Sequence, residues 1–268
     1  MAITNNLNFG NPTKPEVYFQ LREAVAGMKE ACEVLGTPVT GGNVSLYNEN
    51  PTGAVYPTPV IGMVGLVESL AHITRSAFST DGDAVVLLGD NTDELGGSEY
   101  LQRIHGEVIG PPPRVNLRAE KALIEALLEA IRAGTVRSAH DVADGGLAVA
   151  LAECVMMDRA RPVGAQIDLS PWASLPLRAL LFGEAQGRVV VSTPDAAALL
   201  AIAARHGVKA TRIGAVGAAG GRLDVAVGDR QLRANVALLS DAYHEAIPRI
   251  MQRTASAQDV ALASDAVV

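Results

Sequence analysis

The sequence is poor in cysteine, has no excess of basic residues and contains no long apolar run, and each shortage excludes a class of protein. Two cysteines, Cys32 and Cys154, cannot form a disulfide framework, which favours a reducing compartment. The 29 acidic residues outnumber the 22 basic ones, and a net charge of −7 does not suit a general nucleic-acid binder. No apolar run approaches the roughly 18–20 residues of a membrane span, and the first residues lack a signal-peptide pattern. We therefore predict a cytoplasmic protein that binds neither nucleic acid nor membrane.

Two common catalytic patterns are missing as well. No group of cysteine and histidine residues has the spacing of a zinc site, and no Gly-x-Ser-x-Gly segment marks a nucleophile elbow. Hydrophobic residues make up 49% of the chain and charged residues 19%, which is enough apolar material for a packed core. A length of 268 residues indicates one or two folded domains.

The first predicted domain covers residues 1–79. Residues 1–15 are rich in asparagine, glycine and proline, so we expect an ordered loop or a loop-rich edge of a ligand site there. A helix follows, because apolar side chains recur every three or four residues and so share one helix face: Leu21, Val25, Met28, Cys32 and Leu35. Gly36 fits the C-cap of this helix. Residues 54–67 form a β-like run whose prolines favour an edge strand or a bulge.

The second predicted domain covers residues 80–234 and alternates strand and helix patterns. Residues 84–88 are a continuous apolar run, which is typical of a buried strand. Further strands are expected near residues 136–141, 165–169, 188–192 and 211–216, and helices near 116–133, 146–155 and 196–205. This alternation indicates an α/β or α+β domain. Residues 235–268 are predicted as a terminal helix followed by a frayed tail from residue 254.

The strongest local signal is the segment Gly41-Gly42-Asn43-Val44-Ser45. Adjacent glycines allow the backbone to approach a ligand closely, and exposed amides in such a turn can bind an anion. The Asn43 side chain could offer its oxygen to Mg²⁺, and Ser45 would point to the same side if the segment is extended. The alternative is an ordinary glycine turn with a capping asparagine, because the segment matches neither the P-loop nor the dinucleotide fingerprint.

Three other polar segments allow both a functional and a structural interpretation. Residues 4–12 carry four asparagines, whose amides could contact a nucleotide or could only satisfy their own turns. Asp141 and Asp144 could hold Mg²⁺ before a helix N-terminus, or Asp144 could simply cap that helix. Glu184 and Gln186 precede a predicted buried strand and could belong to a site or to its rim.

Five segments taken together closely resemble one family, in which they occur in the same order. They are residues 4–12, 41–48, 56–65, 138–147 and 181–188. Over about residues 1–252, the chain is similar to the large synthetase subunits of phosphoribosylformylglycinamidine synthase in their small bacterial form. The resemblance implies an α+β fold, with a partial ferredoxin-like domain of the aminoimidazole ribonucleotide synthetase N-type followed by an α/β domain of the C-type. It also implies that the chain corresponds to the carboxy-terminal part of such a subunit only.

The resemblance further implies an ATP-dependent carbon–nitrogen ligase of purine biosynthesis. Such synthetases activate formylglycinamide ribonucleotide with ATP and Mg²⁺. Ammonia from a separate glutaminase subunit then gives formylglycinamidine ribonucleotide, ADP and phosphate, and a small third subunit completes the assembly. Catalysis of this phosphoryl transfer depends mainly on Mg²⁺ and on oriented hydrogen-bond donors.

Carried over residue by residue, the resemblance implies roles for four positions. Asn5 and Gly42 match positions that contact ATP, Asn43 matches a magnesium ligand, and Ser45 matches a substrate contact. Asn5 stands where the family usually has aspartate, so an acceptor is kept and a charge is lost. The family's catalytic histidine lies in the missing amino-terminal half, so we expect no catalytic residue in this chain and no activity from it alone.

Two alternative functions are consistent with the same residues. The chain could be a non-catalytic nucleotide-binding or assembly module, or another ATP-dependent member of the superfamily, such as aminoimidazole ribonucleotide synthetase or a thiamine-phosphate kinase. Residues 6–12 argue against those enzyme relatives. Because the first domain is partial, we also expect uncovered strand edges and self-association.

Overall fold

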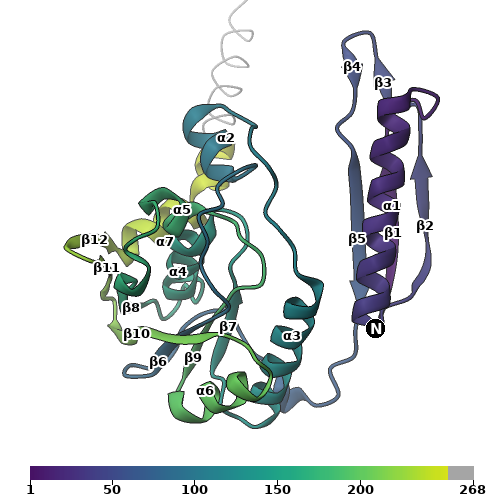
Figure 1. The fold of residues 1–268 in the computed structure, drawn as a ribbon. Helices are drawn as coiled ribbons and strands as arrows, with labels where there is room; N and C mark the ends of the chain where they lie inside the picture. The colour runs from purple at the N-terminus through teal and green to yellow at the C-terminus, as the bar shows by residue number, and fades with distance from the viewer. Residues whose placement is uncertain (253–268) are drawn as a thin grey trace, which may run out of the picture. The chain divides into compact units, whose positions relative to one another are not determined.

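The computed structural model describes residues 1–252, which form two compact units (Figure 1). The first unit comprises Met1–Ile73 and Asn116–Lys121, and the second comprises Thr74–Val115 and the described chain from Ala122 onward. No helix within residues 1–252 is long and apolar enough to cross a membrane. The tail predicted from residue 254 lies outside the described residues.

The first unit contains a three-stranded sheet in the order β2-β1-β5, with the long helix α1 packed on one of its faces (Figure 1). The central strand β1 runs parallel to β2 and antiparallel to β5. The elements of this unit are β1 (Ala2–Asn8), α1 (Pro15–Leu35), β2 (Val39–Ser45), β3 (Glu49–Asn50), β4 (Gly53–Ala54), β5 (Thr58–Val64) and η1 (Leu70–His72). The proline-bearing segment is therefore an outer strand, as predicted.

The prediction of a loop over residues 1–15 is wrong for the first half of that segment, because β1 is the central strand of the sheet. Ile3, Leu7 and Phe9 are buried, with exposed fractions of 5%, 5% and 0%. Polar residues occupy the positions between them, which gives the period of two expected for a strand with one covered face. Asparagine is depleted in strands, so the four asparagines of this segment concealed the alternation.

Helix α1 begins and ends where the chemistry of the sequence favours it. Pro15 lies in the first turn, where the missing N–H of a proline costs no helical hydrogen bond. Gly36 adopts the left-handed conformation with φ of 66° and donates its N–H to the Cys32 carbonyl oxygen. This geometry confirms the predicted C-cap.

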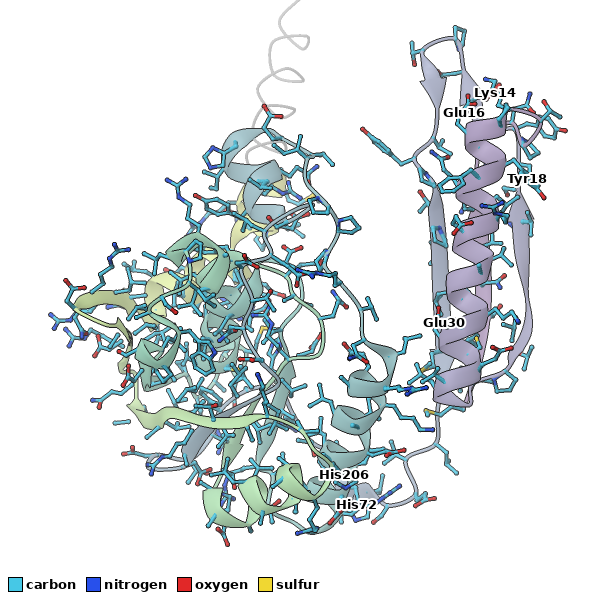
Figure 2. The ribbon with its side chains drawn as sticks, viewed as in Figure 1. Lys14, Glu16, Tyr18, Glu30, His72 and His206 are labelled. Atoms are coloured by element: carbon cyan, nitrogen blue, oxygen red, sulfur yellow. The ribbon has the colours of Figure 1, made fainter. Side chains whose placement is uncertain are left out.

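The core of the first unit is small. Among the 21 residues of α1, only Val17 is fully buried, and it packs against Leu7 and Phe9. Partly buried apolar side chains surround this cluster: Leu21, Ala24, Met28 and Leu46. Glu16 and Tyr18 extend from the first turns of the helix into solvent (Figure 2).

The second unit contains a seven-stranded sheet in the order β12-β11-β8-β10-β6-β9-β7. Neighbouring strands are antiparallel except for β8 and β11, which are parallel. The strands are β6 (Ala84–Leu88), β7 (Ser138–Asp141), β8 (Val163–Asp168), β9 (Val189–Thr193), β10 (Ala210–Ala219), β11 (Arg222–Val227) and β12 (Arg230–Asn235). The helices are α2 (Glu99–His105), α3 (Leu117–Arg132), α4 (Gly146–Met156), η2 (Ser170–Trp172), α5 (Leu177–Phe182), α6 (Ala196–Arg205) and α7 (Val236–His244). The first residues of α3, up to Lys121, are assigned to the first unit. This mixed architecture confirms the predicted α+β fold class.

Helices pack on both faces of the seven-stranded sheet. On one face, α4, α5 and α7 contribute Leu147, Leu180 and Val236 to the larger core. On the other face, α3 and α6 contribute Leu123 and Leu199 to a second core. Strand β6 supplies alternate side chains to both cores, which explains its continuous apolar sequence.

Candidate functional site

The sheet of the first unit brings together two polar segments that are far apart in the sequence. In the parallel pair of β1 and β2, Asn5 lies opposite Gly42 and Asn6 lies opposite Asn43. The register continues to Ser45 at the end of β2. The four residues that the family resemblance identifies therefore lie on two adjacent strands. The glycine-turn interpretation of residues 41–45 is wrong, because this segment is extended throughout.

These residues divide between the two faces of the sheet. Asn5 shares its face of β1 with Ile3 and Leu7, which are buried on the side of α1. Asn43 and Ser45 lie on the opposite face, and their side chains are joined by a hydrogen bond of 3.2 Å from Asn43 Nδ2 to Ser45 Oγ. The extended geometry thus places Asn43 and Ser45 on the same side, as predicted for a strand.

Gly42 is required by the packing of the two strands, independently of any ligand. A β-carbon at this position would lie 2.2 Å from the carbonyl oxygen of Asn5 and 2.4 Å from its Oδ1 atom. Both distances are far shorter than a van der Waals contact, so a larger residue could not be accommodated without moving β1. The Asn5 side chain consequently lies over the Gly42 backbone.

A cavity of about 490 Å³ lies on the sheet of the first unit. It is lined by Thr4, Asn5, Asn6, Gly42, Asn43, Val60 and Gly62. Three of the four implicated residues thus border one cavity. Ser45 does not line it and is connected to it only by the hydrogen bond from Asn43.

The Asn43 side chain is held by two acceptors. Its Nδ2 atom donates to Asn6 Oδ1 at 3.0 Å and to Ser45 Oγ at 3.2 Å. A primary amide has two N–H donors, so both are used and the carbonyl oxygen is left as the free end of the group. Amide oxygens are ligands that Mg²⁺ accepts.

Among the residues that the structure describes, no charged side chain lines this cavity. Within residues 1–252, no cluster of three or more histidine, cysteine, aspartate or glutamate residues could hold a metal ion. Mg²⁺ is commonly bound by one or two carboxylates together with substrate phosphates and water, and this cavity offers the Asn43 amide oxygen in place of a carboxylate. The donor set therefore fits a cation that arrives with a phosphorylated ligand, rather than a metal held by the protein alone.

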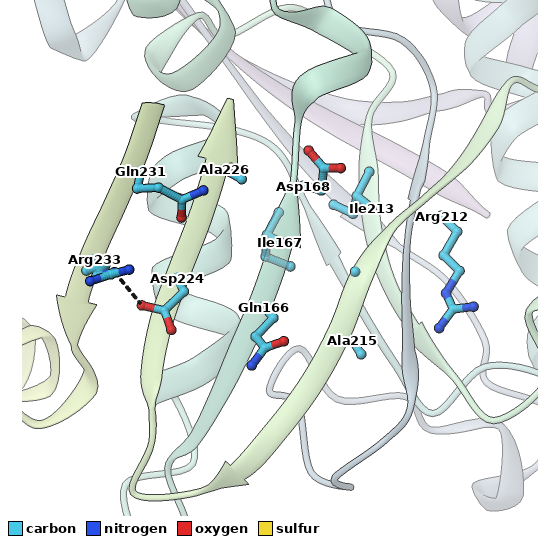
Figure 3. Close-up of a pocket in the computed structure, with 11 residues that line it drawn as sticks. Gln166, Ile167, Asp168, Arg212, Ile213, Ala215, Asp224, Ala226, Gln231 and Arg233 are labelled. Carbon is cyan, nitrogen blue, oxygen red and sulfur yellow. Dashed lines mark ion pairs between the residues drawn. The ribbon is translucent and has the colours of Figure 1, made fainter. Parts of the chain in front are cut away.

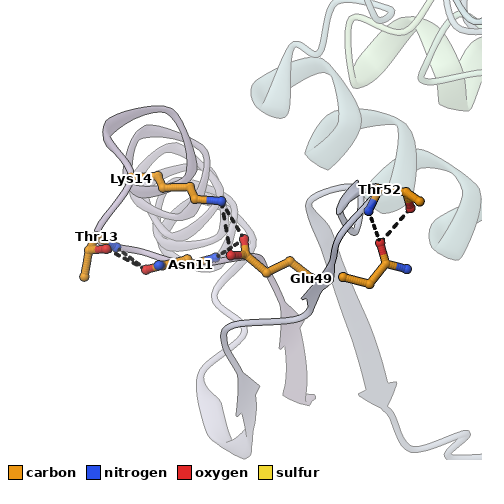
Figure 4. A network of polar contacts seen from close by, with 6 residues as sticks. Asn11, Thr13, Lys14, Glu49 and Thr52 are labelled. Atoms are coloured by element: carbon orange, nitrogen blue, oxygen red, sulfur yellow. Dashed lines mark hydrogen bonds and ion pairs between the residues drawn. The ribbon is translucent and has the colours of Figure 1, made fainter.

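Asn11, another asparagine of the amino-terminal cluster, has a structural role (Figure 4). Asn11 Oδ1 accepts hydrogen bonds from the N–H and hydroxyl of Thr13, at 2.9 and 2.7 Å. The Asn11 N–H donates to the Glu49 carboxylate, which also forms an ion pair with Lys14 at 3.0 Å. Lys14 and this N–H hold the pKa of Glu49 below its ordinary value. The turn interpretation is thus correct for Asn11, whereas Asn5 and Asn6 border the cavity.

In the second unit, Glu184 and not Asp144 binds the N-terminus of helix α4. Helix α4 has Gly145 at its N-cap and no side-chain cap, so the capping role considered for Asp144 is wrong. Glu184 Oε1 instead accepts hydrogen bonds from the Gly145 N–H at 2.8 Å and the Glu99 N–H at 2.9 Å. A carboxylate of the chain itself therefore occupies the N-termini of both α2 and α4.

Arg188 holds the loop before β9 together. Its guanidinium is buried and donates to the Gly183 and Ala185 carbonyl oxygens, at 2.7 and 2.9 Å, and to Asn91 Oδ1 at 2.9 Å. Burial lowers the pKa of Arg188 to about 10, which leaves it charged at neutral pH. These hydrogen bonds account for Arg188, and those to Gly145 and Glu99 account for Glu184, without a ligand.

A second cavity, of about 600 Å³, lies on a polar face formed by β8, β10, β11 and β12 (Figure 3). Gln166, Asp224 and Arg233 are among its lining residues, and Asp224 and Arg233 are 3.9 Å apart. No sequence motif predicted this cavity. Its acidic and basic side chains partly neutralise one another, and a polar face of this kind is common on antiparallel sheets.

Comparison with protein families places both parts of the chain in one family. Residues 1–67 match the family described as AIR synthase related protein, N-terminal domain. Residues 80–226 match AIR synthase related protein, C-terminal domain.

Curated relatives and solved structures are similar to the chain over most of its length. A phosphoribosylformylglycinamidine synthase subunit PurL from Anaeromyxobacter is 44% identical over 263 residues, covering 94% of this chain and 33% of the relative. The chain thus spans about a third of that relative's length. Structures of Thermotoga maritima PurL complexed with ATP and with FGAR align with TM-scores of 0.67 and 0.68. They are 23% and 22% identical, and the alignments cover 90% of this chain and 37% and 39% of those chains.

Proposed function

The chain belongs to the family of AIR synthase related proteins, and we propose that it is the carboxy-terminal part of an ATP-dependent phosphoribosylformylglycinamidine synthase. In the proposed reaction, the formamide oxygen of formylglycinamide ribonucleotide takes the γ-phosphoryl group of ATP. Glutamine-derived ammonia then displaces phosphate, which gives formylglycinamidine ribonucleotide, ADP and inorganic phosphate. This is a carbon–nitrogen ligase reaction of purine biosynthesis.

The observation that carries the proposal is the register of β1 and β2. It places Asn5 beside Gly42 and Asn6 beside Asn43 on the border of one cavity, although the two segments are separated by 37 residues. The similarity to the Anaeromyxobacter relative covers 94% of this chain, and the family match over residues 1–67 includes both segments. The family assignment and the geometry therefore support the same site.

Each residue would act through the atoms it presents. Asn5 and Gly42 would meet ATP through the backbone that they contribute to the cavity, because the Asn5 side chain lies over Gly42 on the opposite face. The Asn43 oxygen would hold Mg²⁺, and the Ser45 hydroxyl would contact the substrate. When bound, Mg²⁺ supplies positive charge that neutralises the transferring phosphoryl group. The protein's part is to orient these neutral donors and acceptors, since the cavity lining supplies no charge.

The missing amino-terminal half is the first partner that we propose. Strand β5 is exposed along its whole length, although its sequence is largely apolar. Met63 and Val64 are 53% and 76% exposed. Covering such side chains is favourable by roughly 25 cal/mol per Å² of apolar surface. The absent half of the synthetase would supply that cover.

Other features of the proposal rest on the family resemblance. We propose a glutaminase subunit and a small third subunit as further partners on that basis. A cytoplasmic location and domains over residues 1–79 and 80–234 are proposed from composition and sequence pattern. A non-catalytic nucleotide-binding module remains the second candidate, because no charged side chain lines the cavity.

A chimera tests the proposal. This chain is substituted for the matching third of the Anaeromyxobacter relative, and amidine formation is measured with formylglycinamide ribonucleotide, ATP, Mg²⁺ and ammonia. We expect turnover by the chimera and none by the 268-residue chain alone. Turnover by the isolated chain would contradict the assignment to a partial subunit. A folded chimera that binds ATP without turnover would favour the non-catalytic module.

A further inference from the structure

Asn6 is the residue that contacts Asn43 most directly, yet the family resemblance gives it no role. The two residues lie directly opposite each other in the register of β1 and β2. Asn6 Oδ1 accepts a hydrogen bond of 3.0 Å from Asn43 Nδ2, and both residues border the same cavity. The contact joins two exposed side chains, so it is not a requirement of core packing.

We propose that Asn6 is a positioning residue that fixes the orientation of the Asn43 amide and directs the Asn43 oxygen to the cation. The inference rests on the proposed function, which assigns Mg²⁺ to Asn43. With Asn6 and Ser45 both accepting from Nδ2, the amide has one arrangement that satisfies all its donors. An amide rotated by half a turn would present N–H groups to the cation and could not bind it.

The neighbours of Asn6 on β1 cannot take its place. Asn5 lies on the face covered by α1, and Thr4 Oγ1 donates to the Gly41 carbonyl oxygen at 3.1 Å. Outer groups that orient a metal ligand commonly contribute 10- to 100-fold to metal affinity. An effect of this size is therefore expected from the single acceptor on Asn6.

The same arrangement fixes the hydrogen-bonding role of the Ser45 hydroxyl. Because Ser45 Oγ accepts from Asn43 Nδ2, its own hydroxyl proton is free to be donated to another acceptor. Asn43 thus donates to both Asn6 and Ser45, and the Ser45 hydroxyl is left as the donor for a further partner. Asn6 would orient both the oxygen for the cation and the hydroxyl for the substrate.

The first test uses nuclear magnetic resonance and needs no metal. In a chain labelled with ¹⁵N-asparagine, the Asn43 side-chain amide is assigned by its loss in Asn43→Ala. We expect its N–H exchange to accelerate at least about tenfold in Asn6→Ala and to stay close to the parent value in Asn6→Asp, whose carboxylate still accepts. Asn50→Ala is the matched control, because Asn50 lies in the β3–β4 hairpin and does not line the cavity. Unchanged exchange in Asn6→Ala would overturn the inference.

The second test measures Mn²⁺ binding in the presence of ATP by electron paramagnetic resonance. We expect Asn6→Ala to weaken Mn²⁺ binding by about 10- to 100-fold, and Asn6→Asp to restore it. Weak binding in Asn43→Ala with parental binding in Asn6→Ala would overturn the inference and leave the proposed function intact. If Asn43→Ala binds Mn²⁺ as the parent does, or if the parent binds none, the proposed metal role of Asn43 fails, and the exchange experiment still decides the role of Asn6.

Discussion

Gly42 lies so close to Asn5 that a β-carbon at position 42 would be 2.2 Å from the Asn5 carbonyl oxygen. The contact joins the two strands that carry the proposed ATP site. A larger residue at position 42 should lower the stability measurably, because the obstructing atoms belong largely to the Asn5 backbone and cannot rotate away.

Gly42→Ala is expected to destabilise the first unit by about 1–3 kcal/mol, the usual cost of overpacking. Gly41→Ala is the matched control, since no atom lies within 4 Å of its added β-carbon. Urea unfolding followed by the fluorescence of tyrosines in the first unit measures the difference. Equal unfolding midpoints for the two variants would contradict the close approach.

Arg188→Ala is expected to destabilise the second unit strongly. The substitution leaves the Gly183 and Ala185 carbonyl oxygens and Asn91 Oδ1 without their donor. A buried acceptor left unpaired costs about 1–3 kcal/mol. Arg178→Ala, at an exposed position on α5, is the control and should change the unfolding midpoint little. A similar loss in both variants would show that the network around Arg188 contributes nothing specific.

The stability of the second unit is expected to fall in acid partly through Glu129. Hydrogen bonds from His206 and Arg205 hold the pKa of the Glu129 carboxyl below its ordinary value of 4.5. A carboxyl whose folded pKa is lowered stabilises the fold above its unfolded pKa, and this contribution is lost as the pH falls through the lowered value. His206 lies where α6 ends, so the pair links α6 to α3 (Figure 2).

Glu129→Gln should therefore reduce the loss of stability between about pH 4.5 and the acid limit. Urea midpoints measured across this range, with Glu125→Gln as the control, test the expectation. Glu125 is exposed on the same helix. If the urea midpoint falls with pH in the same way for Glu129→Gln and the parent, this carboxylate makes no contribution.

Much of the second unit could be predicted from the sequence because its strands and helices have strong apolar patterns. The helix over residues 196–205 and the buried strand over residues 84–88 match α6 and β6. Strands β11 and β12 were missed. Strand β12 is exposed at nearly every position, so its sequence carries almost no alternation, and its pairing with β11 depends on tertiary structure.

The first unit was harder to predict, because the polar residues that make up its candidate site are unusual in strands. Asn5, Asn6 and Asn8 are unfavourable strand residues that nevertheless lie in β1, and β2 contains two adjacent glycines. Composition therefore indicated turns. The pairing of Asn6 with Asn43 depends on the register of β1 and β2, so neither segment predicts it alone. The family resemblance identified Asn5, Gly42, Asn43 and Ser45, and their roles stay predictions until the substitutions are measured.

The exposed surface of β5 predicts that the isolated chain associates with itself. Strand β5 is an outer strand whose edge pairs with no strand within residues 1–252, and both of its faces carry exposed apolar side chains, including Met63 and Val64. Such an edge is a template for pairing with another chain. We expect light scattering to show a molecular mass that rises with protein concentration. Val64→Lys should shift the chain toward the monomer, because burying an unpaired charge in the contact is unfavourable.

Leu238→Lys is the matched control for this prediction. Leu238 is 69% exposed, close to the 76% of Val64, but it lies on α7 in the second unit. If both substitutions reduce association equally, the effect comes from net charge and not from β5. A parent chain that stays monomeric at every concentration would show that β5 does not need cover, and would remove the physical reason for placing the missing half of the synthetase there.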